Sequence, residues 1–262
     1  MVLLHGQPGT GASWDPVTAL LATDFRVLAP DRPGYGSSPE PAVGLAANAD
    51  AVAELLRERA AAPAVVVGHS WSGGVAVLLG LRHPSLVRSM VLVGAACTPD
   101  SVNLLDRLLI LPGVGDALTV AGLAGIGGVF PRLRPLARHA PDPIRARLES
   151  VLPDDGVTGG DQGVLGRHRR TFMIEQRALL DELDLVAGSL GSVAVPVEVV
   201  AGHWDIVVPP KAAVTLTRAI PGARLTLVPR AGHFVARDDP EALAVVVRRA
   251  HRRADAADGS LR

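Results

Sequence analysis

The stretch Gly68-His69-Ser70-Trp71-Ser72-Gly73 limits the possible fold of this chain more than any other feature. It follows Ala64–Val67, an apolar run of β-favouring residues, and it precedes a helix-like segment that begins at Ser72. Glycine allows a sharp turn from strand to helix, and a serine at that turn stands clear of the sheet. The following helix points the positive end of its dipole at the same place. The stretch therefore predicts Ser70 as a nucleophile.

Strand-like and helix-like segments alternate along most of the chain, which favours an α/β fold with a mostly parallel sheet covered by helices on both faces. The predicted strands are Val2–Leu4, Phe25–Ala29, Ala64–Gly68, Ser89–Val93, Val195–Ala201 and Arg224–Val228. The predicted helices are Trp14–Ala22, Leu45–Ala61, Ser72–Arg82, Lys211–Ile220 and Pro240–Arg253.

The alternation stops between about residues 98 and 190, where proline and glycine separate purely helical patterns. These patterns cover Val102–Leu111, Ile144–Leu152 and Arg167–Ala187. We expect residues 98–190 to form a helical cap, or lid, inserted into a core made of residues 1–97 and 191–262. An apolar lid over a site favours an apolar substrate.

The charges of the chain balance, with 26 basic and 26 acidic side chains. This balance argues against nucleic acid or an anionic membrane as a partner. The only cysteine, Cys97, excludes an internal disulfide, and no histidine pair has convincing metal spacing, so we expect no metal. The first residues show no signal peptide, and the apolar run Ala117–Phe130 is too short to span a bilayer. We therefore expect a cytoplasmic protein.

Asp205 and His233 each come shortly after a predicted strand, as Ser70 does. Residues just past the carboxyl ends of parallel strands share one edge of the sheet, which is where ligands bind in open α/β folds. A serine hydroxyl becomes a good nucleophile when an imidazole takes its proton and a carboxylate orients that imidazole. The order Ser70, Asp205, His233 therefore predicts a catalytic triad.

The loop His5-Gly6-Gln7-Pro8-Gly9 follows the first predicted strand. It can bring the backbone amide of Gln7 next to that of Trp71, and two such donors stabilise the oxyanion of a tetrahedral intermediate. We expect the turn Asp31-Arg32-Pro33-Gly34 to be structural and to brace this loop.

These segments together make the chain similar to the α/β-hydrolase superfamily, in the large group with an HG-x-PG oxyanion loop and a helical cap. The matching segments are His5-Gly6-Gln7-Pro8-Gly9, Asp31-Arg32-Pro33-Gly34-Tyr35-Gly36-Ser37-Ser38, Gly68-His69-Ser70, Gly202-x-x-Asp205-x-x-Val208-Pro209 and Gly232-His233. They cover both ends of the chain and leave the middle unmatched. The resemblance implies Ser70 as nucleophile, Asp205 as acid and His233 as base, with the amides of Gln7 and Trp71 as oxyanion hole.

Two features depart from the family pattern. Ser72 stands where the family usually has glycine, although serine is small enough to fit where the helix passes the strand. The family also usually begins with an antiparallel hairpin, whereas this chain begins inside the oxyanion-loop strand, so we expect the N-terminal hairpin to be missing. One edge of the sheet is then uncovered, which favours self-association as a homodimer.

Several assignments stay open at this point. Ser72 is an alternative nucleophile, and Ser70 can also be interpreted as an ordinary helix cap. Rival acids are Asp100, Asp181 and Asp184, although none follows a predicted strand as closely as Asp205 does. Three aromatic residues either line the substrate pocket or pack in the core: Trp14, Trp204 and Phe234.

We expect a serine hydrolase, and specifically a carboxylesterase that cleaves a small or medium apolar ester through an acyl-enzyme and needs no cofactor. Three alternatives fit the same residues. One is a cofactor-free perhydrolase similar to the non-haem haloperoxidases, in which peroxide replaces water. Another is a carbon–carbon bond hydrolase or lyase. The last is a ligand-binding protein that keeps the fold without turnover.

Overall fold

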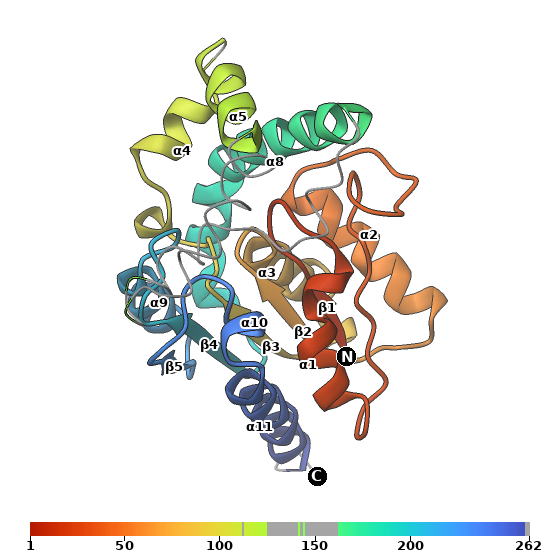
Figure 1. The fold of residues 1–262 in the computed structure, drawn as a ribbon. Coiled ribbons are helices and arrows are strands. Elements are labelled where there is room, and N and C mark those ends of the chain that lie inside the picture. The colour runs from red at the N-terminus through yellow and green to blue at the C-terminus, as the bar shows by residue number, and fades with distance from the viewer. Residues whose placement is uncertain (112, 125–140, 142–143, 145–161, 260–262) are drawn as a thin grey trace.

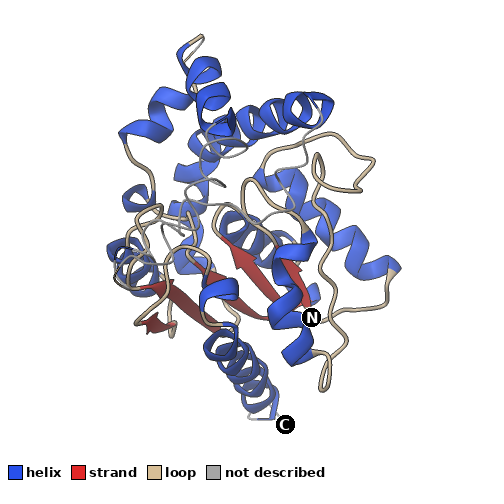
Figure 2. Ribbon diagram, in the orientation of Figure 1, coloured by secondary structure: helices blue, strands red, loops and turns tan. Residues whose placement is uncertain are grey.

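A computed structural model of the chain describes residues 1–111, 113–124, 141, 144 and 162–259 (Figure 1). The described strands form one parallel sheet, and helices surround it on both faces (Figure 2). The order across the sheet is β1 (Val2–Leu4), β2 (Ala64–His69), β3 (Val87–Val93), β4 (Val197–Gly202) and β5 (Arg224–Val228). The predicted parallel sheet between two layers of helices is therefore confirmed.

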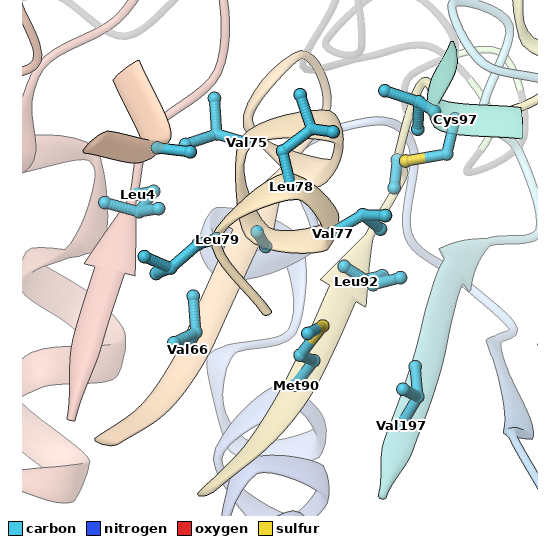
Figure 3. Packing of buried hydrophobic residues seen from close by; sticks show 14 of the residues in the cluster. Leu4, Val66, Val75, Val77, Leu78, Leu79, Met90, Leu92, Cys97 and Val197 are labelled. Atoms are coloured by element: carbon cyan, nitrogen blue, oxygen red, sulfur yellow. The ribbon is translucent and has the colours of Figure 1, made fainter. Parts of the chain in front are cut away.

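Side chains along each strand alternate between two hydrophobic clusters, because successive residues of a strand point to opposite faces of the sheet. Val66 and Leu92 belong to the cluster on one face, whereas Val67 and Val91 belong to the cluster on the other. The first face is covered by α2 (Leu45–Glu58), α3 (Ser72–Arg82) and α9 (Pro210–Ala219), and the second by α1 (Asp15–Leu21) and α11 (Pro240–Gly259), with the short α10 (Val235–Asp238) just before α11. Figure 3 shows Val66 and Leu92 packed against Leu79 of α3.

The predicted strand Phe25–Ala29 is wrong, because this segment forms only one isolated bridge, between Leu28 and Val2. Leu3 N donates to Leu28 O at 2.8 Å, and Leu28 N donates to Met1 O at 2.9 Å. The segment lies outermost, so only β1 is available to pair with it, and the proline at position 30 follows directly. The outer edge of β1 is thus partly covered by the chain itself, and the homodimer that an uncovered edge would favour stays a prediction.

The described elements between β3 and β4 are helical, as expected, and lie together at one end of the sheet (Figure 1). They include α4 (Leu104–Leu109), α5 (Val114–Ala124) and the long α8 (Gln162–Ser189). The predicted helix Ile144–Leu152 lies outside the described residues apart from Ile144. Within the described ranges, no helix is both long and apolar enough to cross a membrane.

Helix α8 does more than cover the sheet edge, since its second half is part of the core. Leu179 and Val186 are buried in the same hydrophobic cluster as the residues of β2 and β3. A 28-residue helix is about 42 Å long, which is enough to run from the insertion into the core. The division into a core and a cap at residues 98 and 190 stays a prediction.

Candidate active site

Ser70 lies at a sharp turn between β2 and α3, in the place where the sequence predicts a raised nucleophile. Its φ angle is +54°, a left-handed conformation that is uncommon for residues other than glycine. Ser70 N donates to Val93 O at 2.8 Å, and Ser70 O accepts from Ala96 N at 3.0 Å, so neighbouring segments hold the strained turn. A Cβ at Gly68 would lie only 2.4 Å from Ser72 O, which explains why glycine precedes the serine by two residues.

Asp205 and His233 lie together past the ends of β4 and β5. Asp205 Oδ2 is 2.8 Å from His233 Nδ1, and both side chains are almost completely buried. Asp205 Oδ1 accepts from the backbone amides of Val207 and Val208, at 2.9 and 2.8 Å. Because a carboxylate only accepts hydrogen bonds, the Nδ1 atom carries the proton and a neutral ring keeps Nε2 free as a base.

Gly94 makes room for this pair, and the sequence analysis did not single it out. It follows β3 directly with φ +49°, and a Cβ there would lie 3.2 Å from both Asp205 Oδ2 and His233 Nδ1. The only sequence signal is a glycine directly after a strand that ends at the same edge as Ser70.

His69 supports the backbone of His233, as its Nε2 lies 3.0 Å from His233 O and donates to this carbonyl. Burial lowers the pKa of His69 to about 3, and the nearby His233 lowers it further. Burial, together with the charge of Arg32, also lowers the pKa of His5 well below its usual value. Both rings are therefore neutral at pH 7, and they form local hydrogen bonds as the sequence suggests.

A cavity of about 130 Å³ lies beside Ser70, and the two predicted oxyanion donors, Gln7 and Trp71, also line it. Within the described part of the chain, neither backbone amide donates to a protein acceptor. The apolar walls come from Trp71, Ala96, Phe172, Leu179, Val207 and Val208. The polar wall consists of Gln7, Ser101, Asp106 and Gln176.

The three aromatic residues that could line a pocket are not among the described walls of this cavity. Trp14 is 1% exposed and packs in the core with β1 and α11. Phe234 lies against the rings of His69 and His233, and Trp204 lies against the ring of His203. Phe234 is thus the one that borders the predicted triad.

The alternative catalytic residues have other partners or positions. Ser72 is completely buried and its hydroxyl donates to His5 O at 2.5 Å. Asp100 accepts from Thr215 Oγ1 at 2.7 Å, away from His233. Asp181 and Asp184 are exposed on α8.

The predicted brace of the oxyanion loop is Arg32, which is buried. Its Nε donates to His5 O at 2.9 Å and its Nη2 donates to Gly6 O at 3.0 Å. Glu175 of α8 binds the other side of the same guanidinium, and Tyr35 OH donates to Glu175 Oε2 at 2.7 Å. Burial raises the pKa of the Glu175 carboxyl, although Arg32 opposes this rise. No local sequence pattern indicated that Glu175 reaches this loop.

The family model described as the alpha/beta hydrolase family matches residues 1–246. The chain belongs to the α/β-hydrolase family. This membership agrees with the strained turn at Ser70 and with the parallel sheet, and the predicted fold and the prediction of a hydrolase are confirmed.

Curated relatives of this α/β hydrolase match over nearly its whole length. An uncharacterized protein of Mycobacterium tuberculosis is 30% identical over 95% of this chain and 74% of its own length. A pimeloyl-[acyl-carrier protein] methyl ester esterase of Neisseria meningitidis is 28% identical, over 99% of this chain and 93% of its own length. Among solved structures, a thermophilic esterase of Thermogutta terrifontis has the same fold, with a TM-score of 0.70 and 21% identity over 97% of this chain and 89% of its own.

Proposed function

We propose that this α/β hydrolase is a serine carboxylesterase that acts on small apolar esters through an acyl-enzyme. The observation that carries the proposal is the 2.8 Å contact between Asp205 and His233 at the sheet edge where Ser70 is raised. The orientation of His233 by a buried carboxylate leaves Nε2 to take the proton of Ser70. The neisserial relative is named as an ester-cleaving enzyme, which supports the same type of bond here.

The reaction follows from these positions. His233 takes the proton of Ser70 while Oγ attacks the ester carbonyl, and the amides of Gln7 and Trp71 hold the developing oxyanion. His233 then gives the proton to the leaving alcohol, and Ser70 keeps the acyl group. Water repeats the sequence, with His233 as base, and releases the acid.

The size of the cavity indicates which acyl groups fit. Its volume of about 130 Å³ corresponds to about four water molecules, at about 30 Å³ each. Leu179 and Val208 contribute to its apolar walls, so a short alkyl chain fits better than a long or charged one. We therefore propose acyl groups of about two to four carbons as the preferred substrates.

A fluorophosphonate probe tests the activated serine directly. We expect covalent labelling at Ser70, identified by mass spectrometry of the peptide, and no labelling of the His233→Ala variant. Circular dichroism of both proteins checks that they are folded. Folded wild-type protein that the probe does not label would contradict the proposal and would favour a ligand-binding protein.

A series of p-nitrophenyl esters tests the substrate class. We expect kcat/KM to be highest for acetate to butyrate and to fall at least tenfold for octanoate, because the longer chain does not fit beside Leu179. The Ser70→Ala variant should lose about 10⁴-fold or more of the activity. Equal activity on all chain lengths would contradict the size argument but not the serine chemistry.

A further inference from the structure

A buried ion pair connects the insertion to the oxyanion loop. The side chains of Arg32 and Glu175 are 1% and 0% exposed, and each Glu175 oxygen accepts from a different guanidinium nitrogen. The guanidinium also lies between two aromatic rings, with its central carbon 4.5 Å from the Trp71 ring centre and 5.1 Å from that of Tyr35. Arg32 is therefore held from several sides.

The fixed guanidinium determines where the Gln7 amide points. Arg32 Nη2 binds Gly6 O at 3.0 Å, and this carbonyl belongs to the same planar peptide group as Gln7 N–H. In a trans peptide, the carbonyl and the N–H point in opposite directions. A hydrogen bond that fixes Gly6 O therefore also fixes the direction of the Gln7 N–H.

The same turn of α8 also holds the side chains of both oxyanion donors. Trp71 Nε1 donates to Glu175 O at 2.9 Å. Gln7 Nε2 donates to Phe172 O at 2.9 Å. Helix α8 thus contacts the oxyanion loop directly, contacts the turn after Ser70, and contacts Arg32 between them.

Stability alone does not explain why two charges are buried here, because an apolar pair of similar volume is often as stable as a buried ion pair. An apolar pair would, however, leave the carbonyls of His5 and Gly6 without the guanidinium. The geometry points instead to a role in orienting the loop.

We propose that Glu175 is a positioning residue for the reaction, because through Arg32 it orients the peptide group whose N–H serves as an oxyanion donor. This inference rests on the proposed function. It makes one turn of the helical insertion, Phe172–Glu175, part of the apparatus that stabilises the transition state. Glu175 itself touches no reacting atom.

The test compares Glu175→Gln with the matched variant Glu182→Gln. Glu182 lies on the same helix and also connects it to the core, since its carboxylate accepts from the amides of Leu45 and Ala46 at 2.9 Å. Glu182 has no printed contact with the oxyanion loop and thus controls for general loosening of α8. The double variant Arg32→Met/Glu175→Leu removes both charges and serves if Glu175→Gln does not fold.

Two kinetic readouts distinguish positioning from a merely structural role. We expect kcat per titrated active site to fall about 10- to 100-fold in Glu175→Gln and in the double variant, with KM within threefold. The inhibition constant of a trifluoromethyl ketone, which forms a tetrahedral oxyanion with the serine, should rise by the same factor. Glu182→Gln should stay within twofold of wild type in both. Values within twofold of wild type for Glu175→Gln, or for the double variant if Glu175→Gln does not fold, would overturn the inference.

Hydrogen exchange gives a readout that does not require activity. We expect the amides of residues 4–10 to exchange faster in Glu175→Gln than in wild type or Glu182→Gln. If the wild type neither reacts with the fluorophosphonate nor cleaves esters, the proposed function fails and this readout decides alone. Unchanged exchange would then overturn the positioning role, and faster exchange confined to Glu175→Gln would support it.

Discussion

The acid–base half of the candidate site and its oxyanion half are held in different ways. Asp205 and His233 follow neighbouring strands, and short-range contacts such as Asp205 Oδ1 to the amides of residues 207 and 208 fix them. The oxyanion half depends on Arg32 and on Glu175, which lie 143 residues apart in the chain. The first half is therefore a local device of the core, whereas the second requires the insertion to be docked.

This difference predicts which substitutions act on the proton relay alone. The most severe should be Asp205→Asn, which removes the charge that orients His233 and favours the wrong tautomer. We expect kcat to fall about 10³- to 10⁴-fold while the affinity for a trifluoromethyl ketone falls less, because the oxyanion half is intact. Ester hydrolysis and inhibition by the ketone measure the two effects.

Asp100→Asn is the matched control for this substitution, since Asp100 is the rival acid and binds Thr215. It should keep kcat within twofold of wild type. Comparable losses in both variants would contradict the assignment of Asp205.

Gly94→Ala should have the next largest effect, because it disturbs the relay through its shape. The added Cβ would lie 3.2 Å from Asp205 Oδ2 and from His233 Nδ1, and the backbone is left-handed at φ +49°. We expect a loss of about 1–2 kcal/mol in the free energy of unfolding and a fall of about 10- to 100-fold in kcat. Urea unfolding and steady-state kinetics provide the two measurements.

Gly222→Ala isolates the backbone contribution to that result. Its φ of +67° imposes the same kind of strain, but nothing lies within 4 Å of the added Cβ. It should lose similar stability and keep wild-type kcat. If Gly94→Ala also kept wild-type kcat, the close approach of Gly94 to the Asp205–His233 pair would be irrelevant to catalysis.

Acid sensitivity comes from the histidine that joins the two halves. The folded-state pKa of His69 is about 3, because burial disfavours its charged form. As the pH falls below about 6.5, the unfolded chain binds a proton at His69 that the folded chain does not bind. The free energy of unfolding therefore decreases by up to about 1.4 kcal/mol per pH unit from this residue, until the pH reaches the folded-state pKa.

The variant His69→Gln measures that contribution, since glutamine keeps an N–H donor for His233 O but does not titrate. Urea unfolding of both proteins between about pH 6 and pH 4 should show a slope smaller by about one proton in the variant. Above about pH 7.5 the two curves should run parallel. Equal slopes in acid would mean that His69 is not buried in its neutral form.

The contrast between the two halves also explains what sequence can predict here. Ser70, Asp205 and His233 follow strands, and the helix Ser72–Arg82 has both predicted bounds, because local patterns encode these features. Phe25–Ala29 has a strand-like composition, but its position outside β1 leaves it with a single bridge. Whether a segment becomes a strand depends on its neighbours as well as on its residues.

Glu175 illustrates the other limit. A glutamate in a predicted helix is usually a solvated surface residue, and nothing near it in the sequence indicates a buried partner. Its burial follows from the docking of α8, which brings it to Arg32 across 143 residues. The sequence predicts that Arg32 braces the loop, but only the tertiary structure identifies what holds Arg32.

Ser72→Ala should produce the smallest effect, and it tests whether the core adds its own hold on the oxyanion half. Ser72 replaces the usual glycine of the family, and its hydroxyl donates to His5 O, which also accepts from Arg32. Removal of the hydroxyl should lower the free energy of unfolding by about 0.5–1.5 kcal/mol. We expect kcat to fall by no more than about fivefold, because Arg32 still holds the carbonyl.

Thr215→Val removes a hydrogen bond of similar length, to Asp100, far from the oxyanion loop, and should lower stability without changing kcat. A lower kcat in Ser72→Ala alone would show that the loop has two supports, one in the core and one in the insertion. If both variants kept wild-type kcat, the hydroxyl of Ser72 would contribute only to stability, and Arg32 would be the sole tested support of the loop. A loss of 10³-fold or more in Ser72→Ala would instead restore Ser72 as the nucleophile and break the comparison at its centre.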